Sequence, residues 1–315
     1  MRYRGPGQHS RQPRDGEPQA TGFRGIASPG QHRPEDMGGF RGVAPPRQHW
    51  APGSGAREGA PPGRHSRDIG FAVAASAVLA AYNNVTGLDS GHERWYVRLN
   101  AGATGAALAA ATLSGLTPAD LGLGRGRRLP GRLGCGLAAG AGACWLLIAV
   151  VPATRPLLGD QRAAGLSGRD VAYQALIRIP VGTALWEETA FRGVLQAALC
   201  RVLPGTAAIV VTSGVFGAWH IRPTLQALRA NGLAGDRRRA IAGTFAGCAA
   251  TAAGGALLSW LRARSGRLAD TVLLHAAVNS GGLLAAHAVA ARSRSGVGGP
   301  AGVVGVDDEP RLAAA

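Results

Sequence analysis

Seven apolar segments between residues 69 and 291 constrain the fold of this chain more than any other feature. Most of them approach the roughly 20 residues that an α-helix needs to cross a hydrocarbon core. Irregular backbone and open strands cannot face lipid, because their polar groups would lack partners, so the segments are predicted to be helices. The predicted spans are 69–85, 99–116, 133–153, 172–199, 203–221, 240–261 and 268–291. We therefore expect an all-α polytopic membrane protein with about seven transmembrane helices.

Two polar tails flank the apolar segments. Residues 1–68 are rich in Gly, Pro, Arg, Gln and His and poor in large aliphatic side chains, so they cannot bury enough surface to offset the entropy of ordering. We expect a disordered tail over 1–68 and a flexible tail over 292–315. The body between them divides into a group of N-terminal transmembrane helices, 69–171, and a second group, 172–291, that carries the polar motifs.

The formal net charge is +16, and all the basic side chains are arginines. A nucleic-acid partner would require arginines clustered on one folded face, often among aromatic side chains, and no such stripe is seen. The arginines lie instead near the ends of apolar segments, as expected of charges that flank a lipid bilayer, although their distribution leaves the orientation open. The bias towards Ala, Gly and Arg is typical of GC-rich bacterial coding, so we expect a multi-pass protein of a bacterial plasma membrane.

Two carboxylates and a guanidinium interrupt the fourth segment, in the stretch 186–193, which reads WEETAFRG. Charges at bilayer depth are costly unless they are paired or face a polar cavity, so this cluster is a candidate functional site. Glu188 and Arg192 are four residues apart and are predicted to pair on one helix face. Glu187 lies about 100° around the helix and is left free to act as a general base. The alternative is an ion-paired network that only fixes helix packing.

Two further motifs place polar side chains at helical spacing. Phe216 and His220 share a face of the fifth segment, and His275 and Asn279 share a face of the seventh. A membrane histidine often serves only as an interhelical hydrogen-bonding group. The second pair could bind a metal, hold a water or donate hydrogen bonds to an oxyanion. Asp270 is more than a turn away from His275 and is interpreted as a helix N-cap.

Together the motifs place one free glutamate, two histidines and one asparagine on three different membrane helices. Peptide hydrolysis in a membrane requires such a set, because water must be brought in, deprotonated and aimed at a carbonyl. A proton-coupled transporter could use the same residue types but would not need the Glu-Glu/Arg spacing. Internal inverted repeats, which many transporters show, are not seen in the sequence.

The three motifs resemble the signature motifs of the CAAX-processing and bacteriocin-processing family of intramembrane endopeptidases. This family includes the type II CAAX prenyl endopeptidases and the Abi-type bacterial proteins. The resemblance rests on Glu187-Glu188 with Arg192, on Phe216 with His220 and on His275 with Asn279, in this order and on apolar segments, and it covers roughly residues 172–291.

The resemblance implies an all-helical protease that hydrolyses peptide bonds of membrane-associated substrates with a water activated by Glu187. It implies that His220 assists, that His275 and Asn279 stabilise the oxyanion, and that Glu188, Arg192 and Phe216 support them. A zinc site with Glu187, His220 and His275 as ligands is an open alternative. The expected partners are a peptide or protein substrate and the lipid bilayer, with no nucleic acid. A non-catalytic membrane scaffold or bacteriocin-immunity protein is the alternative function.

The predicted spans place the two histidines at different depths in the membrane, although both are expected in one site. His220 lies near the end of its segment and His275 near the start of its own, and these two helices should run parallel. Strongly tilted helices are one solution. We expect instead that the predicted boundaries are shifted and that the fifth helix continues past Pro223 towards Arg229, so that the two side chains can meet.

Overall fold

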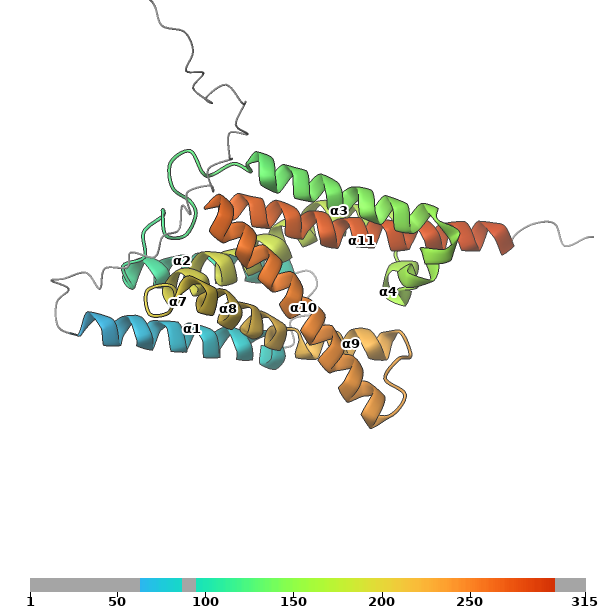
Figure 1. Cartoon of the computed structure of the whole chain (residues 1–315). Helices are drawn as coiled ribbons and strands as arrows, with labels where there is room; N and C mark the ends of the chain where they lie inside the picture. The colour runs from blue at the N-terminus through green and yellow to red at the C-terminus, as the bar shows by residue number, and fades with distance from the viewer. Residues whose placement is uncertain (1–62, 87–94, 298–315) are drawn as a thin grey trace, which may run out of the picture. The chain divides into compact units, whose positions relative to one another are not determined.

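The computed structural model describes residues 63–86 and 95–297, which form helices joined by turns, with no strand among them (Figure 1). The predicted all-α class is therefore confirmed for this part of the chain. The predicted tails fall largely on residues 1–62 and 298–315, which lie outside the described residues. Residues 64–68 and 292–297, which the sequence assigned to the tails, are helical.

Helix occupies all seven predicted segments. In chain order the elements are α1 (Arg64–Thr86), α2 (Tyr96–Leu113), α3 (Arg132–Val150), η1 (Pro152–Leu158), α4 (Gln161–Ala164), α5 (Gly168–Tyr173), η2 (Gln174–Ala184), α6 (Leu185–Glu188), η3 (Thr189–Leu195), α7 (Gln196–Leu199), α8 (Gly205–Trp219), α9 (Ile221–Ala230), α10 (Arg237–Ser265) and α11 (Leu268–Val297).

Among the described residues, three helices are long and apolar enough to cross a membrane by length and composition, namely α3, α10 and the Leu268–Arg294 part of α11. Helix α8 is apolar but has only 15 residues. These helices indicate a membrane protein, whereas seven transmembrane helices are not confirmed within the described residues. One physical reason is the polar content of the other segments. The fourth segment alone contains Arg178, Glu187, Glu188 and Arg192.

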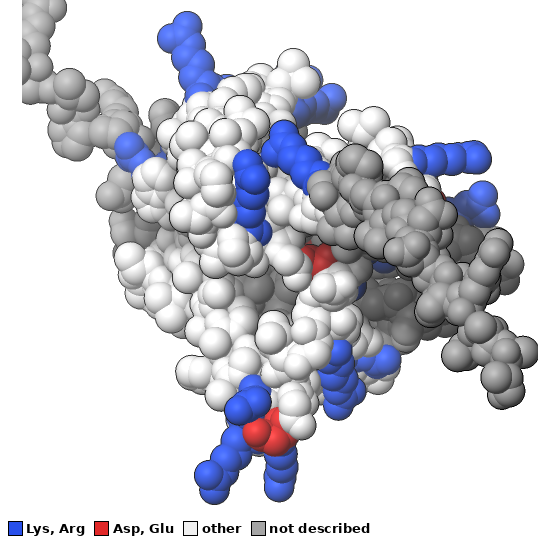
Figure 2. All heavy atoms as spheres, turned by 90° about the vertical axis from the view of Figure 1, so that its right-hand side faces the viewer, with Lys and Arg blue, Asp and Glu red and all other residues white. Residues whose placement is uncertain are grey.

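Large apolar side chains remain exposed on the helix surfaces. Leu146 of α3 is 65% exposed, and Phe245 of α10 is 76% exposed. Soluble monomers rarely expose wide apolar patches, so such a surface fits contact with lipid better than contact with water. Figure 2 shows one end of the molecule, where arginines project from an otherwise largely uncharged surface.

The fourth predicted segment is one continuous helical stretch from Gly168 to Leu199 that alternates between α- and π-helical geometry. In η2 the Leu185 N–H donates to the Pro180 carbonyl five residues earlier, which is the π-helical register. Pro180 lacks an N–H, and local π-helical adjustment is one way in which membrane helices tolerate proline. The stretch therefore passes Pro180 without ending and carries the acidic cluster on α6 and η3.

An aromatic cluster packs the charged stretch against α1 and α8. The Tyr82 ring stacks on Trp219 with 5.5 Å between centroids, and Trp186 lies 6.2 Å from Trp219. Phe191 meets Phe216 edge to face at 4.9 Å. Such offset and edge-to-face pairs add specific geometry to apolar burial, so they fix the rotation of these helices relative to one another.

Two glycines allow α8 and α10 to approach each other closely. A Cβ atom at Gly217 would lie 2.8 Å from the Cys248 carbonyl oxygen. One at Gly255 would lie 3.0 Å from the Phe216 ring and 3.1 Å from the Arg192 guanidinium. Small residues at membrane-helix contacts commonly serve this purpose. Gly217 thus lets the two backbones approach, and Gly255 makes room for the Phe216 and Arg192 side chains.

The fifth predicted segment differs from expectation at its C-terminal end. Helix α8 stops at Trp219, and α9 begins at Ile221 after a break at His220, whose φ is −94° and ψ is 7°. The chain does stay helical past Pro223 to Ala230, but as a separate helix. Pro223 accounts for part of this, because it cannot donate to the carbonyl of Trp219 four residues earlier.

Asp270 is not the N-cap of its own helix. Its carboxylate is fully buried in the first turn of α11 and accepts a hydrogen bond from the backbone N–H of Gly131, the N-cap residue of α3. A Cβ at Gly134 would overlap this carboxylate, so a glycine is needed there. Asp270 therefore joins the start of α11 to the start of α3, an arrangement that local sequence spacing could not indicate.

Candidate active site

Glu188 is the centre of a buried ion-pair cluster. Its Oε1 accepts a hydrogen bond from Nη1 of Arg192 at 2.9 Å and lies 2.7 Å from Nδ1 of His275. The side chains of Glu188 and Arg192 are completely buried. The pair predicted from the four-residue spacing is therefore present. His275, which comes from α11, joins it as a third member.

Arg192 connects the cluster to two more helices. Its Nη2 donates to the Gly255 carbonyl of α10 at 3.1 Å, and its guanidinium carbon lies 4.2 Å from the centre of the Phe216 ring of α8. A cation over an aromatic face is attracted by the negative face of the ring, an effect that strengthens on burial. Arg192 thus holds η3, α8 and α10 in register while it offsets the charge of Glu188.

Glu187 has a different environment from its neighbour. The residue is 6% exposed, and its Oε1 accepts a hydrogen bond from Nε1 of Trp219 at 3.2 Å. Among the described residues its Oε2 has no hydrogen-bond partner and lies 3.8 Å from Nε2 of His275. That distance is too long for a direct hydrogen bond, and polar groups so placed are commonly bridged by water. One oxygen of Glu187 is therefore positioned and the other is available.

The Phe216 ring lies between the two predicted histidines. Its centroid is 4.6 Å from that of His220 and 6.3 Å from that of His275, and both contacts are edge to face. The motif spacing places Phe216 one turn before His220, and the tertiary fold brings His275 to the same ring. Phe216 therefore acts as the spacer through which α8 and α11 set the positions of both imidazoles.

His220 occupies the break between α8 and α9. Its Nδ1 lies 2.8 Å from the Phe216 carbonyl oxygen. A carbonyl only accepts hydrogen bonds, so Nδ1 carries the proton and Nε2 is the nitrogen left for proton transfer. His220 is half-buried, in contrast to the fully enclosed ion pair. Its contact with the cluster runs through Phe216.

Asn279 is not part of the buried cluster. It lies one turn after His275 on α11, and its side chain is exposed.

The three candidate ligands of the alternative zinc site are not brought together in the structure. Within residues 63–86 and 95–297, no group of three or more His, Cys, Asp or Glu side chains has the spacing to hold a metal ion. Glu187 and His275 approach each other, while His220 is directed to Phe216.

Two contributors to the site were not identified from the sequence. Trp219 donates to Glu187, and Gly255 offers its carbonyl to Arg192. The position of Trp219 next to His220 was a usable signal, because an indole N–H needs an acceptor when buried. No local signal distinguishes Gly255 from the many other glycines of the apolar segments.

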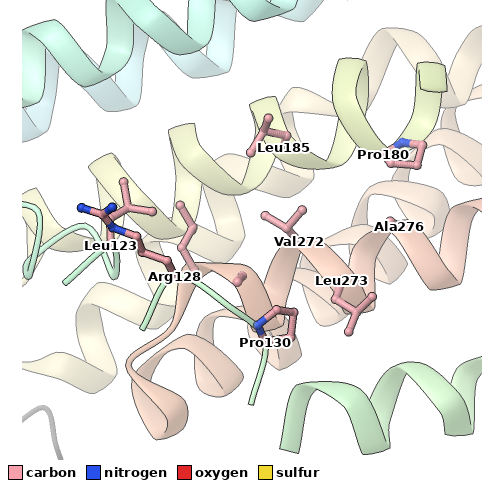
Figure 3. A pocket seen from close by; sticks show the side chains of 10 residues that line it. Leu123, Arg128, Pro130, Pro180, Leu185, Val272, Leu273 and Ala276 are labelled. Atoms are coloured by element: carbon pink, nitrogen blue, oxygen red, sulfur yellow. The ribbon is translucent and has the colours of Figure 1, made fainter. Parts of the chain in front are cut away.

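A cavity of about 390 Å³ lies beside the cluster, between η2, α6, the start of α11 and the 123–130 loop (Figure 3). Its lining is mostly apolar, with Arg128 as the charged side chain. Leu185 and Ala276 line it, yet neither Glu187 nor His275 does. The cavity is therefore adjacent to the charged cluster and separate from it, and it does not mark where water would meet Glu187.

Comparison with known proteins agrees with the motifs. Neither the curated proteins nor the solved structures contain a match to this chain. A family model described as "Type II CAAX prenyl endopeptidase Rce1-like" matches residues 171–281. This range contains all three motifs and ends two residues after Asn279. The family predicted from the motifs is thereby confirmed, and residues 171–281 carry an Rce1-like domain of the type II CAAX prenyl endopeptidase kind.

Proposed function

We propose that this protein is an intramembrane endopeptidase that hydrolyses peptide bonds of membrane-associated substrates with a water activated by Glu187. The family match supports a CAAX-type membrane protease in general. The single observation that carries the finer proposal is the difference between the adjacent carboxylates. Oε2 of each carboxylate lacks a hydrogen-bond partner among the described residues. Glu188, however, is fully buried with Arg192 and His275 both on its Oε1, whereas Glu187 keeps slight exposure and its Oε2 faces an imidazole nitrogen.

In the proposed reaction a water lies between Oε2 of Glu187 and the substrate. The carboxylate takes one proton from the water, and the oxygen forms a bond with the scissile carbonyl carbon. The carbonyl electron pair moves onto its oxygen and gives an oxyanion. When the tetrahedral intermediate collapses, the C–N bond breaks and the leaving amine takes the proton that Glu187 holds. Trp219 restrains the other oxygen of Glu187 throughout.

His275 is suited to stabilise the oxyanion. Glu188 accepts only, so the Nδ1 of His275 carries a proton in their 2.7 Å contact. Glu187, Glu188 and Arg192 together carry a net charge of −1, and an imidazolium at His275 would make the buried cluster neutral. Buried charges are least costly when they are balanced and hydrogen-bonded. An imidazolium also presents Nε2–H as a donor towards developing negative charge.

His220 and Asn279 complete the proposal. His220 has Nε2 available, and we assign it assistance to Glu187 in moving the proton from the attacking water to the leaving amine. Asn279 lies one turn beyond His275 and is exposed, so a substrate on that side of α11 could take its amide N–H as a second oxyanion donor. Any peptide substrate must bring its scissile carbonyl close to Oε2 of Glu187 and Nε2 of His275.

Cleavage by purified protein in lipid nanodiscs tests the proposal. With a library of apolar peptides as substrate, Glu187→Gln and His220→Ala should each lower kcat by about 10²- to 10⁴-fold. Asp270→Asn is a matched control, because Asp270 is a fully buried carboxylate of α11 outside the cluster. It should keep kcat within a few-fold of wild type. If the Glu187 and His220 variants cut as well as wild type, the assignment fails. A Glu187→Gln protein with an undiminished biological effect would favour the scaffold or immunity function.

A further inference from the structure

The last turn of α1 lies against the break at His220. Nδ2 of Asn84 donates to the Ala218 carbonyl at 2.7 Å, and Oδ1 of Asn84 accepts from the Arg222 N–H at 2.9 Å. These two backbone groups lie two residues before and two residues after His220. One amide side chain therefore bridges the end of α8 and the start of α9.

The bridge has a clear physical purpose. A helix end leaves backbone carbonyls without partners, and a helix start leaves N–H groups without partners. In an apolar environment each such group is costly. An asparagine offers one acceptor and two donors, so it can satisfy both ends of a break at once. The second donor of Asn84 is used too, because Nδ2 also lies 2.8 Å from the Ala80 carbonyl of its own helix.

Neighbouring side chains of α1 extend the same contact. Asn83 donates to the Trp219 carbonyl at 3.3 Å, and Tyr82 stacks on the Trp219 indole. That indole donates to Glu187. The end of α1 therefore touches both the backbone that presents His220 and the side chain that restrains Glu187.

We infer that Asn84 is a positioning residue for His220, which holds the α8–α9 break in the conformation that places the imidazole. The inference rests on the proposed function of His220 in peptide hydrolysis. Asn84 lies in α1, upstream of the 171–281 segment that matches the family model. The first helix is therefore part of the catalytic apparatus and more than an apolar lead-in to the domain.

Steady-state cleavage in nanodiscs tests the catalytic part of the inference. Asn84→Ala should lower kcat by about 10- to 100-fold, because small misplacement of a catalytic group has a large effect on rate, and KM should stay within about twofold. Asn84→Asp keeps the acceptor for Arg222 but sets a carboxylate oxygen against the Ala218 and Ala80 carbonyls, so it should lower kcat at least as much as Asn84→Ala. In a His220→Ala background Asn84→Ala should cause no further fall in kcat, since the group that it positions is gone.

Hydrogen–deuterium exchange tests the structural part without any substrate. Asn84→Ala should speed exchange of the 218–224 amides by about tenfold, as expected when hydrogen bonds that hold them are lost. Asn100→Ala is the matched control, because Asn100 is a buried asparagine of α2 that donates to the Gly182 carbonyl at 2.8 Å. It should leave exchange over 218–224 unchanged.

The outcomes separate the two claims. An Asn84→Ala protein with wild-type kcat overturns the inference and leaves the proposed function standing. So does an equal fall in kcat in the presence and absence of His220. If the wild-type protein cuts nothing, the proposed function fails, and unchanged exchange over 218–224 in Asn84→Ala would then refute the bridge as well.

Discussion

Two buried polar clusters of this protein look alike in composition but differ in their partners. One joins Glu187, Glu188, Arg192 and His275, and the other joins Asp270 and Arg262 to the turns between α2 and α3. In the second cluster backbone groups are among the partners, since Arg262 donates to the Asp120 carbonyl and Asp270 accepts from the Gly131 N–H. In the first cluster the partners are mostly ionisable side chains.

The difference shows why an unpaired buried oxygen alone does not mark a catalytic base. Asp270 and Glu187 each have one buried carboxylate oxygen without a hydrogen-bond partner among the described residues. The bonded oxygen of Asp270, Oδ1, lies against the backbone of Gly131 and Gly134, which is no proton-transfer partner. Oε2 of Glu187 lies 3.8 Å from Nε2 of His275, and an imidazole nitrogen can exchange a proton with a carboxylate. The groups around the whole carboxylate, and not an unpaired oxygen by itself, distinguish a structural carboxylate from a catalytic one.

Arg192→Leu should be the most damaging test of this contrast. Removal of the guanidinium leaves Glu188 buried without its countercharge, and breaking a buried pair costs about 3–5 kcal/mol. Arg262→Leu leaves the Asp120 carbonyl short of a donor, with an expected cost of about 1–3 kcal/mol. Thermal unfolding in detergent, followed by circular dichroism, measures both. Equal destabilisation by the two variants would show that the two clusters do not differ.

A second test places strain in the structural cluster alone. A Cβ at Gly134 would overlap the Asp270 carboxylate, so Gly134→Ala should destabilise the junction of α3 and α11 by about 1–3 kcal/mol. Gly136 has open space around its Cβ position, so Gly136→Ala on the same helix is the matched control. Gly134→Ala and Gly136→Ala, measured well below the unfolding temperature, should both have a kcat close to that of wild type. A large loss of kcat in Gly134→Ala would connect Asp270 to the chemistry.

The smallest effect is expected at a surface charge outside both clusters. Hydrogen bonds from Arg162 hold the pKa of Asp160 below its ordinary value, against the opposing effect of partial burial. A lowered pKa in the folded state contributes stability above the pKa of the unfolded chain, about 4, and this stability is lost as pH falls further. The thermal midpoint of wild type should therefore fall slightly more than that of Asp160→Asn between pH 5 and pH 3. Parallel curves would contradict this.

Much of the fold and part of the site were predictable because they depend on local spacing. Apolar segment length predicted helices at all seven positions. The four-residue separation predicted the Glu188–Arg192 pair, which forms within a continuous helical stretch. Membrane crossing was less predictable, since length and overall apolarity do not show how charged positions within a segment limit its insertion. The break at His220 was missed because residues distant in sequence stabilise it.

The sequence by itself determined that the chain is helical, which residues share a helix face and which family the 171–281 segment resembles. These properties depend on periodicity and on residue type, and both can be read directly from the sequence. The tertiary structure decided that His275 meets both glutamates, that Asn279 stays exposed and that Asn84 bridges the break. Such contacts depend on the rotation and depth of each helix, and close packing of glycines and aromatic rings sets both only when the helices meet.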